Sequence, residues 1–303
     1  MTIAQALRDA AQQLASVSDT ARLDGELLMA HAFGVPRSAL LLRHMGDPVP
    51  ASFQALVERR ERHEPVAYII GRQEFFGLGL EVDASVLIPR HDSETIIEAA
   101  QTSFAGRPPA QVLDLGTGSG ALLLAALSVW PQAQGLGIDC DAAALAIARR
   151  NAVRVGINPH PPGEATGDMS AGQVENAPRA MFALLDWRRL EWQEQLSRFD
   201  LIVANPPYVE TAADLSPSVR QWEPAGALFA GQEGLDDYLL LIPQLPHLLR
   251  PDGRAVLEIG HTQADAVRAI AQDARFDVDI VKDLGGRPRA AVLAIKGWQT
   301  ASE

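Results

Sequence analysis

The sequence has almost no cysteine: Cys140 is the only one among 303 residues. A single cysteine excludes an internal disulfide and a structural zinc site built from several thiolates, and it suits a reducing compartment. The seven histidines form no HExxH-type pair. We therefore expect no metal, and we interpret the position of Cys140 beside Asp139 as incidental.

Long apolar runs are also missing. No stretch approaches the roughly 20 apolar residues of a membrane-spanning helix, and charged residues such as Arg8, Asp9 and Glu26 interrupt the N-terminal segment. These absences predict a cytoplasmic protein with no membrane partner.

Basic residues are outnumbered. The chain has 26 Lys and Arg against 38 Asp and Glu, which gives a net charge of −12. Nonspecific nucleic-acid binding depends mainly on Lys and Arg, so we expect no direct nucleic-acid partner. Arg59, Arg60 and Arg62 do cluster, and we interpret them as the solvated face of a helix rather than as a basic patch.

The length of the chain predicts about two domains, and 47% hydrophobic residues are enough for a large core. Helical spacing of apolar residues over 2–63 predicts a helical domain at 1–73, and alternation around glycines 77 and 79 predicts a hairpin over 74–86 within a linker at 74–90. Alternating strands and helices over 91–303 predict an α/β domain with a mostly parallel, doubly wound sheet. Residues 158–180 break this alternation and are predicted to form a disordered or mobile loop.

A glycine loop begins the α/β domain. The strand-like run 112–115 contains Asp114 and leads into Gly116-Thr117-Gly118-Ser119-Gly120, before a helix-like segment at 121–129. Such a loop permits close backbone approach, and a helix start presents free N–H groups to a ligand. A second strand ends in Asp139, 21 positions beyond Gly118, where an acid can accept hydrogen bonds from ribose hydroxyls. This unit predicts a nucleoside-bearing cofactor.

The glycine loop alone leaves the cofactor open. Gly116, Gly118 and Ala121 also satisfy the loose dinucleotide fingerprint, so a nicotinamide enzyme remains an alternative. Asp114, at the end of the first strand, is placed to hold an ammonium group. A hydride-transfer enzyme also has no evident use for the Asn-Pro-Pro-Tyr motif at residues 205–208.

Asn205-Pro206-Pro207-Tyr208 directly follows the apolar run 201–204, where a buried strand opens into a loop. The prolines remove two backbone donors and keep Asn205 out of the helical region, which leaves its amide and nearby carbonyls to face a cavity. Such a wall accepts hydrogen bonds from a planar NH2 group, and Tyr208 can cover the flat face of that group. The alternative is a simple strand-ending turn.

Together the two motifs resemble the S-adenosylmethionine-dependent methyltransferases that modify planar nitrogens. Further segments are similar to the release-factor glutamine methyltransferases, called PrmC or HemK, and they match in family order between about residues 64 and 295. These segments are 64–71, 74–77, 87–90, 223–224, 257–260 and 283–286.

The resemblance implies methyl transfer from S-adenosylmethionine, with S-adenosylhomocysteine as product, to the glutamine amide nitrogen in the Gly-Gly-Gln loop of peptide-chain release factors. It implies that the Asn205 oxygen and the Pro206 carbonyl accept the two amide hydrogens, while Pro207 and Tyr208 complete the substrate site beside Arg90. We expect no catalytic histidine, because an N-protonated, N-methylated amide loses its proton readily. The helical domain is expected to help dock the release factor, and the enzyme to be a monomer.

The resemblance also assigns the cofactor site. It places Gly116, Thr117, Gly118, Ser119 and Gly120 around the methionine part, Asp139 on the ribose, Asp186 and Trp187 near the adenine, and Asn205 beside both ligands. Asp139 has the alternative of a strand-end cap, and Trp187 that of packing a loop. Residues 90–94 resemble the family's loop beside the active site, and Asp92 or Ser93 has the alternative of being only an N-cap for the following helix. Glu258 and Arg289 match family positions and are assigned structural roles.

Three other functions are alternatives to methylation of release factors. A ribosomal-protein glutamine methyltransferase uses the same Asn-Pro-Pro-Tyr chemistry, but residues 89–94 look more like the release-factor enzymes, with His91 and Ser93 as mild departures. An adenine methyltransferase acting on DNA or RNA has to flip its base and hold a charged backbone, which the net charge of −12 disfavours. A non-enzymatic nucleotide-sensing or assembly module requires a decayed site, and both motifs are intact.

Overall fold

Helices form the N-terminal part of the chain in the computed structural model, which describes residues 1–159 and 178–297. Leu7, Leu28 and Val57 are fully buried at the centre of this helical unit. A capping box at Thr2 begins the first helix, and Gly34 ends the second in the left-handed conformation. The helices are α1 (Ile3–Gln13), α2 (Ala21–Phe33), α3 (Arg37–Arg43), α4 (Phe53–Glu61) and α5 (Val66–Ile70).

Two later segments join the helical unit. The chain divides into one unit of residues 1–72, 82–84 and 214–223 and another of residues 73–81, 85–213 and 224–303. Residues 214–223 lie within the range 91–303 of the predicted methyltransferase domain, and in this division they and their helix α9 (Pro217–Trp222) belong to the helical unit.

The burial of Arg60 contradicts the prediction of a solvated helix face at residues 59–62. Arg60 is only 7% exposed, so the cluster at 59–62 is not simply a solvated helix face. The Arg60 guanidinium donates to Asp24 at 2.7 Å and to the Ser218 hydroxyl at 3.0 Å. The sequence pattern could not show this, because the acid that pairs with Arg60 is on another helix and Ser218 comes from a distant segment.

The expected hairpin forms over 72–81, slightly earlier than predicted. Its strands are β1 (Arg72–Phe75) and β2 (Leu78–Glu81), which form a two-stranded sheet. The turn residues Phe76 and Gly77 have φ of 51° and 74°. Positive φ at both central residues matches the twist of a two-residue hairpin.

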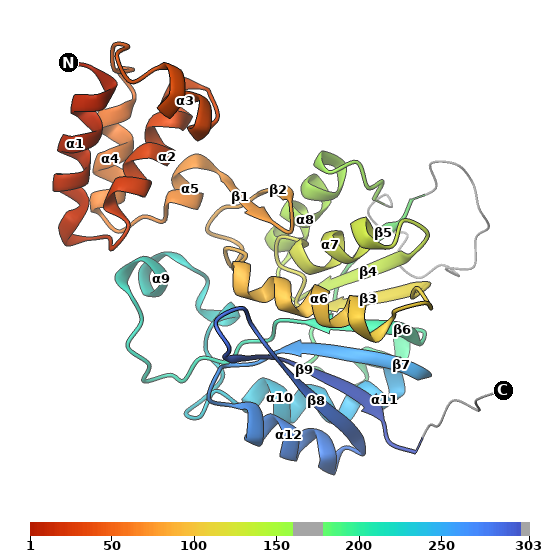
Figure 1. Cartoon of the computed structure of the whole chain (residues 1–303). Coiled ribbons are helices and arrows are strands. Elements are labelled where there is room, and N and C mark those ends of the chain that lie inside the picture. The colour runs from red at the N-terminus through yellow and green to blue at the C-terminus, as the bar shows by residue number, and fades with distance from the viewer. Residues whose placement is uncertain (160–177, 298–303) are drawn as a thin grey trace. The chain divides into compact units, whose positions relative to one another are not determined.

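A seven-stranded sheet organises the second unit (Figure 1). Its order is β5-β4-β3-β6-β7-β9-β8, and the first five strands in this order are parallel. The last strand of the chain, β9, lies between β7 and β8 and is antiparallel to both. The strands are β3 (Gln111–Leu115), β4 (Gln134–Asp139), β5 (Ala180–Leu184), β6 (Phe199–Ala204), β7 (Leu249–Glu258), β8 (Phe276–Lys282) and β9 (Pro288–Ile295).

Helices cover both faces of this sheet, as the predicted doubly wound fold requires (Figure 1). One face packs against α6 (Glu94–Ser103), α7 (Ala121–Val129) and α8 (Ala142–Arg154). The other packs against α10 (Asp236–Leu241), α11 (Leu245–Leu248) and α12 (Ala264–Asp273). Short 3-10 helices lie at Leu14–Ser16, His91–Ser93, Trp192–Gln195, Ala225–Ala227 and Ile242–Gln244.

The strand register determines where the site forms. Leu115 of β3 pairs with Ile138 of β4 and with Ala204 of β6, and Ala204 also pairs with Leu257 of β7. The residues that follow these strands therefore leave the sheet side by side at its carboxyl edge. The strand order reverses beside β3, which is the position where doubly wound sheets bind ligands.

Most of the predicted loop at 158–180 lies outside the described residues, although Ala180 already begins β5. Within the described residues, no helix has the length and apolar content needed to cross a membrane.

Candidate active site

A cavity of about 310 Å³ opens at the carboxyl edge of β3, β4, β5 and β6. Each strand contributes the loop that follows it, so residues from four separate motifs reach one space. The predicted site residues that line the cavity are Gly116, Thr117, Gly118, Ser119, Asp139, Asp186, Trp187, Asn205 and Pro207.

The glycine loop is held against the end of β4. The N–H groups of Gly116 and Thr117 both donate to the Ile138 carbonyl, at 3.0 and 2.8 Å. Gly116, Gly118 and Gly120 have φ of 72°, 53° and 83°, a region that side chains other than glycine disfavour. The loop therefore needs its glycines to reach the start of α7.

Trp187 forms one wall of the cavity by packing on Gly116. A Cβ atom added at Gly116 would lie 2.9 Å from the Trp187 ring, so the indole needs a glycine beneath it. The indole N–H donates to Asp237 Oδ1 at 2.9 Å, and Arg188 also pairs with Asp237. Trp187 thus packs a loop and also lines the cavity, so it is placed where a ligand could contact it.

Asp139 has a carboxylate at the edge of the cavity. Its Oδ2 accepts from the Gly118 N–H at 2.8 Å, and its Oδ1 accepts from the Asp141 N–H at 3.0 Å. Burial raises the pKa of Asp139, while these backbone hydrogen bonds lower it. Each oxygen retains a lone pair, so the side chain is able to accept hydrogen bonds from a ligand as well as to cap the loop.

Asp114 lies behind the glycine loop and is not among the residues that line the cavity. Its Oδ2 accepts from the Thr117 hydroxyl at 2.6 Å and from the Leu123 N–H at 3.2 Å. Its Oδ1 is buried with no hydrogen-bond partner among the described residues. The carboxylate therefore joins the glycine loop to α7 through hydrogen bonds to Oδ2, and its Oδ1 accepts none from the described residues.

Burial raises the pKa of Asp114 to about 7. Between the ordinary value near 3.8 and about 7, the folded protein holds a proton that the unfolded chain lacks, so stability should fall as pH rises through this range. We expect Asp114→Asn to remove about 3 kcal/mol of the difference in free energy of unfolding between pH 5 and pH 8. Urea unfolding of both proteins without ligand measures this difference.

Asp139 also has a raised pKa, but it is present in both proteins, so their difference reports the titration of Asp114 together with its coupling to Asp139, the smallest cause of the Asp114 shift. An equal pH dependence in the wild type and in Asp114→Asn would contradict the predicted titration.

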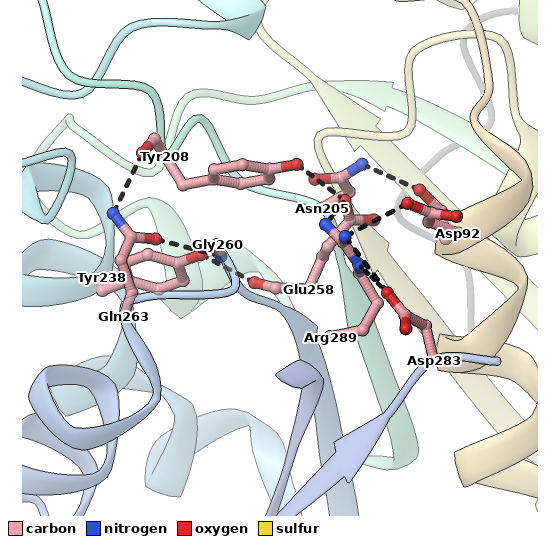
Figure 2. A network of polar contacts seen from close by, with 10 residues as sticks. Asp92, Asn205, Tyr208, Tyr238, Glu258, Gly260, Gln263, Asp283 and Arg289 are labelled. Carbon is pink, nitrogen blue, oxygen red and sulfur yellow. Dashed lines mark hydrogen bonds and ion pairs between the residues drawn. The ribbon is translucent and has the colours of Figure 1, made fainter. Parts of the chain in front are cut away.

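The Asn205-Pro206-Pro207-Tyr208 segment leaves β6 beside the glycine loop. Asn205 and Pro207 line the cavity, whereas Pro206 is buried and Tyr208 lies outside the lining. Figure 2 shows that Tyr208 is held at both ends. Its hydroxyl donates to Glu258 Oε1 at 2.9 Å, and its backbone carbonyl accepts from Gln263 Nε2 at 3.0 Å. The segment is more than a strand-ending turn, because a buried polar network fixes it.

Residues 90–93 approach the same network. Burial and the neighbouring Glu258 raise the pKa of Tyr208, and the charges of Arg289 and Arg90 partly offset that rise. Arg90 does not line the cavity. Asp92 pairs with Arg289 at 3.1 Å, and the Ser93 hydroxyl lies 3.5 Å from Asn205 Nδ2. Ser93 occupies the N-cap position of α6 but makes no side-chain capping bond. The N-cap alternative therefore holds for the position of Ser93, without a capping hydrogen bond from its side chain, whereas Asp92 lies one residue earlier in the 3-10 helix His91–Ser93.

Comparison with known proteins identifies the family. Residues 5–71 match the family described as the PrmC N-terminal domain, and residues 95–205 match ribosomal protein L11 methyltransferase (PrmA). A release factor glutamine methyltransferase from Cereibacter sphaeroides is 37% identical over 95% of this chain and 97% of its own length. One from Xylella fastidiosa is 40% identical over 91% of this chain and 94% of its own length. The chain belongs to the release factor glutamine methyltransferase family.

Membership of the release factor glutamine methyltransferase family confirms the resemblance drawn from the sequence and the assignment as a methyltransferase. Among solved structures, the hMettl16 catalytic domain in complex with a 3′UTR hairpin has a TM-score of 0.53 at 14% identity, covering 84% of each chain. At this identity the likeness shows the shared fold alone, and it confirms the predicted α/β class. Within the described residues, no group of His, Cys, Asp and Glu is arranged to hold a metal ion.

Sequence reasoning missed several supports of the site in this family member. Glu258 was assigned only a structural role, yet it contacts Tyr208. Gln263 and Asp237 carried no signal at all, because each acts on a loop that is distant in sequence. For Glu258 a signal existed: an acid that ends an apolar strand in a parallel sheet lies at the carboxyl edge, where the site forms.

Proposed function

We propose that this enzyme transfers a methyl group from S-adenosylmethionine to the side-chain amide nitrogen of the glutamine in the Gly-Gly-Gln loop of peptide-chain release factors. The observation that carries the proposal is the meeting of Asn205 with the glycine loop and Asp139 in one cavity. Full-length similarity to release factor glutamine methyltransferases supports the choice of substrate. We further propose that the enzyme is cytoplasmic and monomeric, and that the helical unit helps to dock the release factor.

The residues around the cavity fit this cofactor. Asp139 offers acceptor lone pairs for the ribose hydroxyls, and Trp187, with Asp186, offers a surface for the adenine. Asp114 does not line the cavity, but its Oδ1 has no hydrogen-bond partner among the described residues and is the acceptor that we assign to the ammonium group. Gly116 to Gly120 are assigned to the rest of the methionine part. When bound, S-adenosylmethionine supplies an electrophilic methyl group.

Orientation is the main contribution of the protein to catalysis. A glutamine amide nitrogen is a poor nucleophile because its lone pair is delocalised into the carbonyl. We assign the Asn205 side-chain oxygen and the Pro206 backbone carbonyl as acceptors for the two amide hydrogens, with Tyr208 and Arg90 beside them. Alignment of this kind contributes several kcal/mol, up to the roughly 7 to 11 kcal/mol of well-oriented intramolecular reactions.

No strong base is required at this site. The nitrogen that has gained a methyl group is very acidic, and its proton passes to an acceptor that it already contacts and then to water. Broad contact with a charged nucleic-acid backbone is not expected, because the net charge is −12.

The test is transfer of a radiolabelled methyl group from S-adenosylmethionine, with mass spectrometry to locate it. The purified enzyme is incubated separately with a release factor, with the Gln-to-Ala variant of its loop, with ribosomal proteins and with DNA. We expect label on the loop glutamine and none on the loop variant. Label on a ribosomal protein or on adenine instead would overturn the substrate, and no label on any acceptor would overturn methyl transfer as proposed.

A further inference from the structure

Glu258 is a buried carboxylate next to the proposed amide site. Because Ala204 of β6 pairs with Leu257 of β7, Asn205 and Glu258 leave the sheet as neighbours. Glu258 is 1% exposed, and a buried carboxylate is costly unless its surroundings compensate it. A role for Glu258 must therefore account both for its position beside Asn205 and for its burial.

Figure 2 shows what surrounds this carboxylate. The Tyr208 hydroxyl donates to Oε1 at 2.9 Å, and Arg289 lies 4.0 Å from the same oxygen. Arg289 is itself held by Asp92 at 3.1 Å and by Asp283 at 3.3 Å. The positive charge is thereby shared among three acids instead of being bound to Glu258 alone.

Ser93 connects Glu258 to Asn205. Burial raises the pKa of Glu258, and the neighbouring hydroxyls of Ser93 and Tyr208 partly offset that rise. The Ser93 contact falls short of a full hydrogen bond, since Glu258 Oε2 has no direct partner among the described residues. On its other side, the Ser93 oxygen is the acceptor 3.5 Å from Asn205 Nδ2. Hydrogen bonds of this kind are often long before substrate binds.

The donors and acceptors of these groups determine which atom donates at each contact between Glu258, Ser93 and Asn205. When Glu258 is ionised its carboxylate only accepts hydrogen bonds, so we assign the single proton of Ser93 to the side of its hydroxyl that faces Glu258. The Ser93 oxygen then accepts from Asn205, which assigns the NH2 end of the Asn205 amide to Ser93. Ser93 is 4% exposed, so water does not compete strongly. The oxygen of Asn205 is left to face the cavity, where the incoming amide has hydrogens to donate.

We propose that Glu258 is a positioning residue for the amide site. It acts through Ser93 to set the orientation of Asn205, and directly on the Tyr208 hydroxyl to hold the ring beside the same group. Gln263 complements it by binding the Tyr208 carbonyl, so residues at the end of β7 and just beyond it hold Tyr208 at both ends. This inference rests on the proposed function, because its role is defined by the amide that Asn205 receives.

The test uses Glu258→Gln, Ser93→Ala and the double variant. Glutamine nearly matches the shape of glutamate, but it has only one accepting oxygen, and its NH2 must point at Ser93 or Tyr208. The control is Asp200→Asn, the same chemical change at the opposite end of β6, where Asp200 accepts from the N–H groups of Ala110 and Gln111. For each protein, kcat, KM for the acceptor, Kd for S-adenosylmethionine and Tm are measured.

We expect each single variant to lose about 10- to 100-fold in kcat, the range for one hydrogen bond to a charged group. The Kd for S-adenosylmethionine should stay at the wild-type value. Because both residues act on Asn205 through one chain, the double variant should lose little more than the worse single variant, rather than the product of the two losses. Asp200→Asn should keep wild-type kcat even where its Tm falls.

An unchanged kcat in Ser93→Ala or Glu258→Gln would overturn the inference, and so would fully multiplicative losses in the double variant. If kcat falls only in parallel with Tm in Glu258→Gln, and does the same in Asp200→Asn, then Glu258 has only a structural role and the inference is wrong. If Glu258→Gln does not fold, Ser93→Ala decides by itself through kcat and Kd. Failure of the proposed function is separately visible, because the wild-type enzyme would then transfer no label to the glutamine.

Discussion

Asn205→Ala is expected to lower kcat by about 100- to 1,000-fold, the cost of removing one preorganised hydrogen-bonding group from an active site. The residue lines the cavity beside the glycine loop, and we assign its oxygen to the substrate amide. Without that acceptor the amide nitrogen is no longer fixed with its electron density toward the methyl group. Single-turnover kinetics with a saturating release factor measure the loss.

The cofactor should bind almost normally to Asn205→Ala. Calorimetry with S-adenosylmethionine tests this, because the main assigned cofactor contacts lie on other strands. Asp200→Asn serves as the control for general damage to β6. Weak cofactor binding combined with normal turnover at saturation would contradict the role assigned to Asn205.

Asp139→Ala is expected to have the opposite effect and to raise the Kd for S-adenosylmethionine by about 100-fold, consistent with losing hydrogen bonds to a charged acceptor. The carboxylate also accepts from the Gly118 N–H at 2.8 Å, so its removal loosens the glycine loop as well. At saturating cofactor, kcat should recover toward the wild-type value. Calorimetry and a cofactor titration of turnover measure the two quantities.

Asp139→Asn provides a graded comparison. Its side chain keeps the shape and one accepting oxygen but loses the charge, so its Kd should lie between those of the wild type and Asp139→Ala. If the Kd of Asp139→Ala were unchanged, the ribose assignment would be wrong and Asp139 would be only the cap of the glycine loop.

Local patterns predicted many elements of the α/β domain because each pattern reports one segment. The apolar run before the glycine loop forms β3, and the segment after the loop forms α7 over the predicted residues 121–129. The run before Asn205 forms β6. Since parallel strands present their carboxyl ends at one edge, the convergence of these motifs could also be predicted.

Pairings between distant segments were not predictable in the same way. The placement of β9 between β7 and β8 depends on which edge the final strand finds, and no property of residues 288–295 alone specifies it. Arg60 looked like one member of a solvated cluster, yet burial against Asp24 and Ser218 gives it a structural role. Asp114 was predicted to hold an ammonium group, and its residue type and position gave no sign that hydrogen bonds to Thr117 and Leu123 hold it behind the glycine loop.

The sequence by itself determined the family, the fold class and the motifs, because these depend on residue types and spacings along the chain. Only the tertiary structure decided how the motifs are supported. Glu258, Ser93 and Asn205 are far apart in sequence, and strand register and the packing of α6 bring them together. Burial then determines which hydrogen bonds each side chain makes, because a carboxylate shielded from water has only the few donors of neighbouring residues as partners.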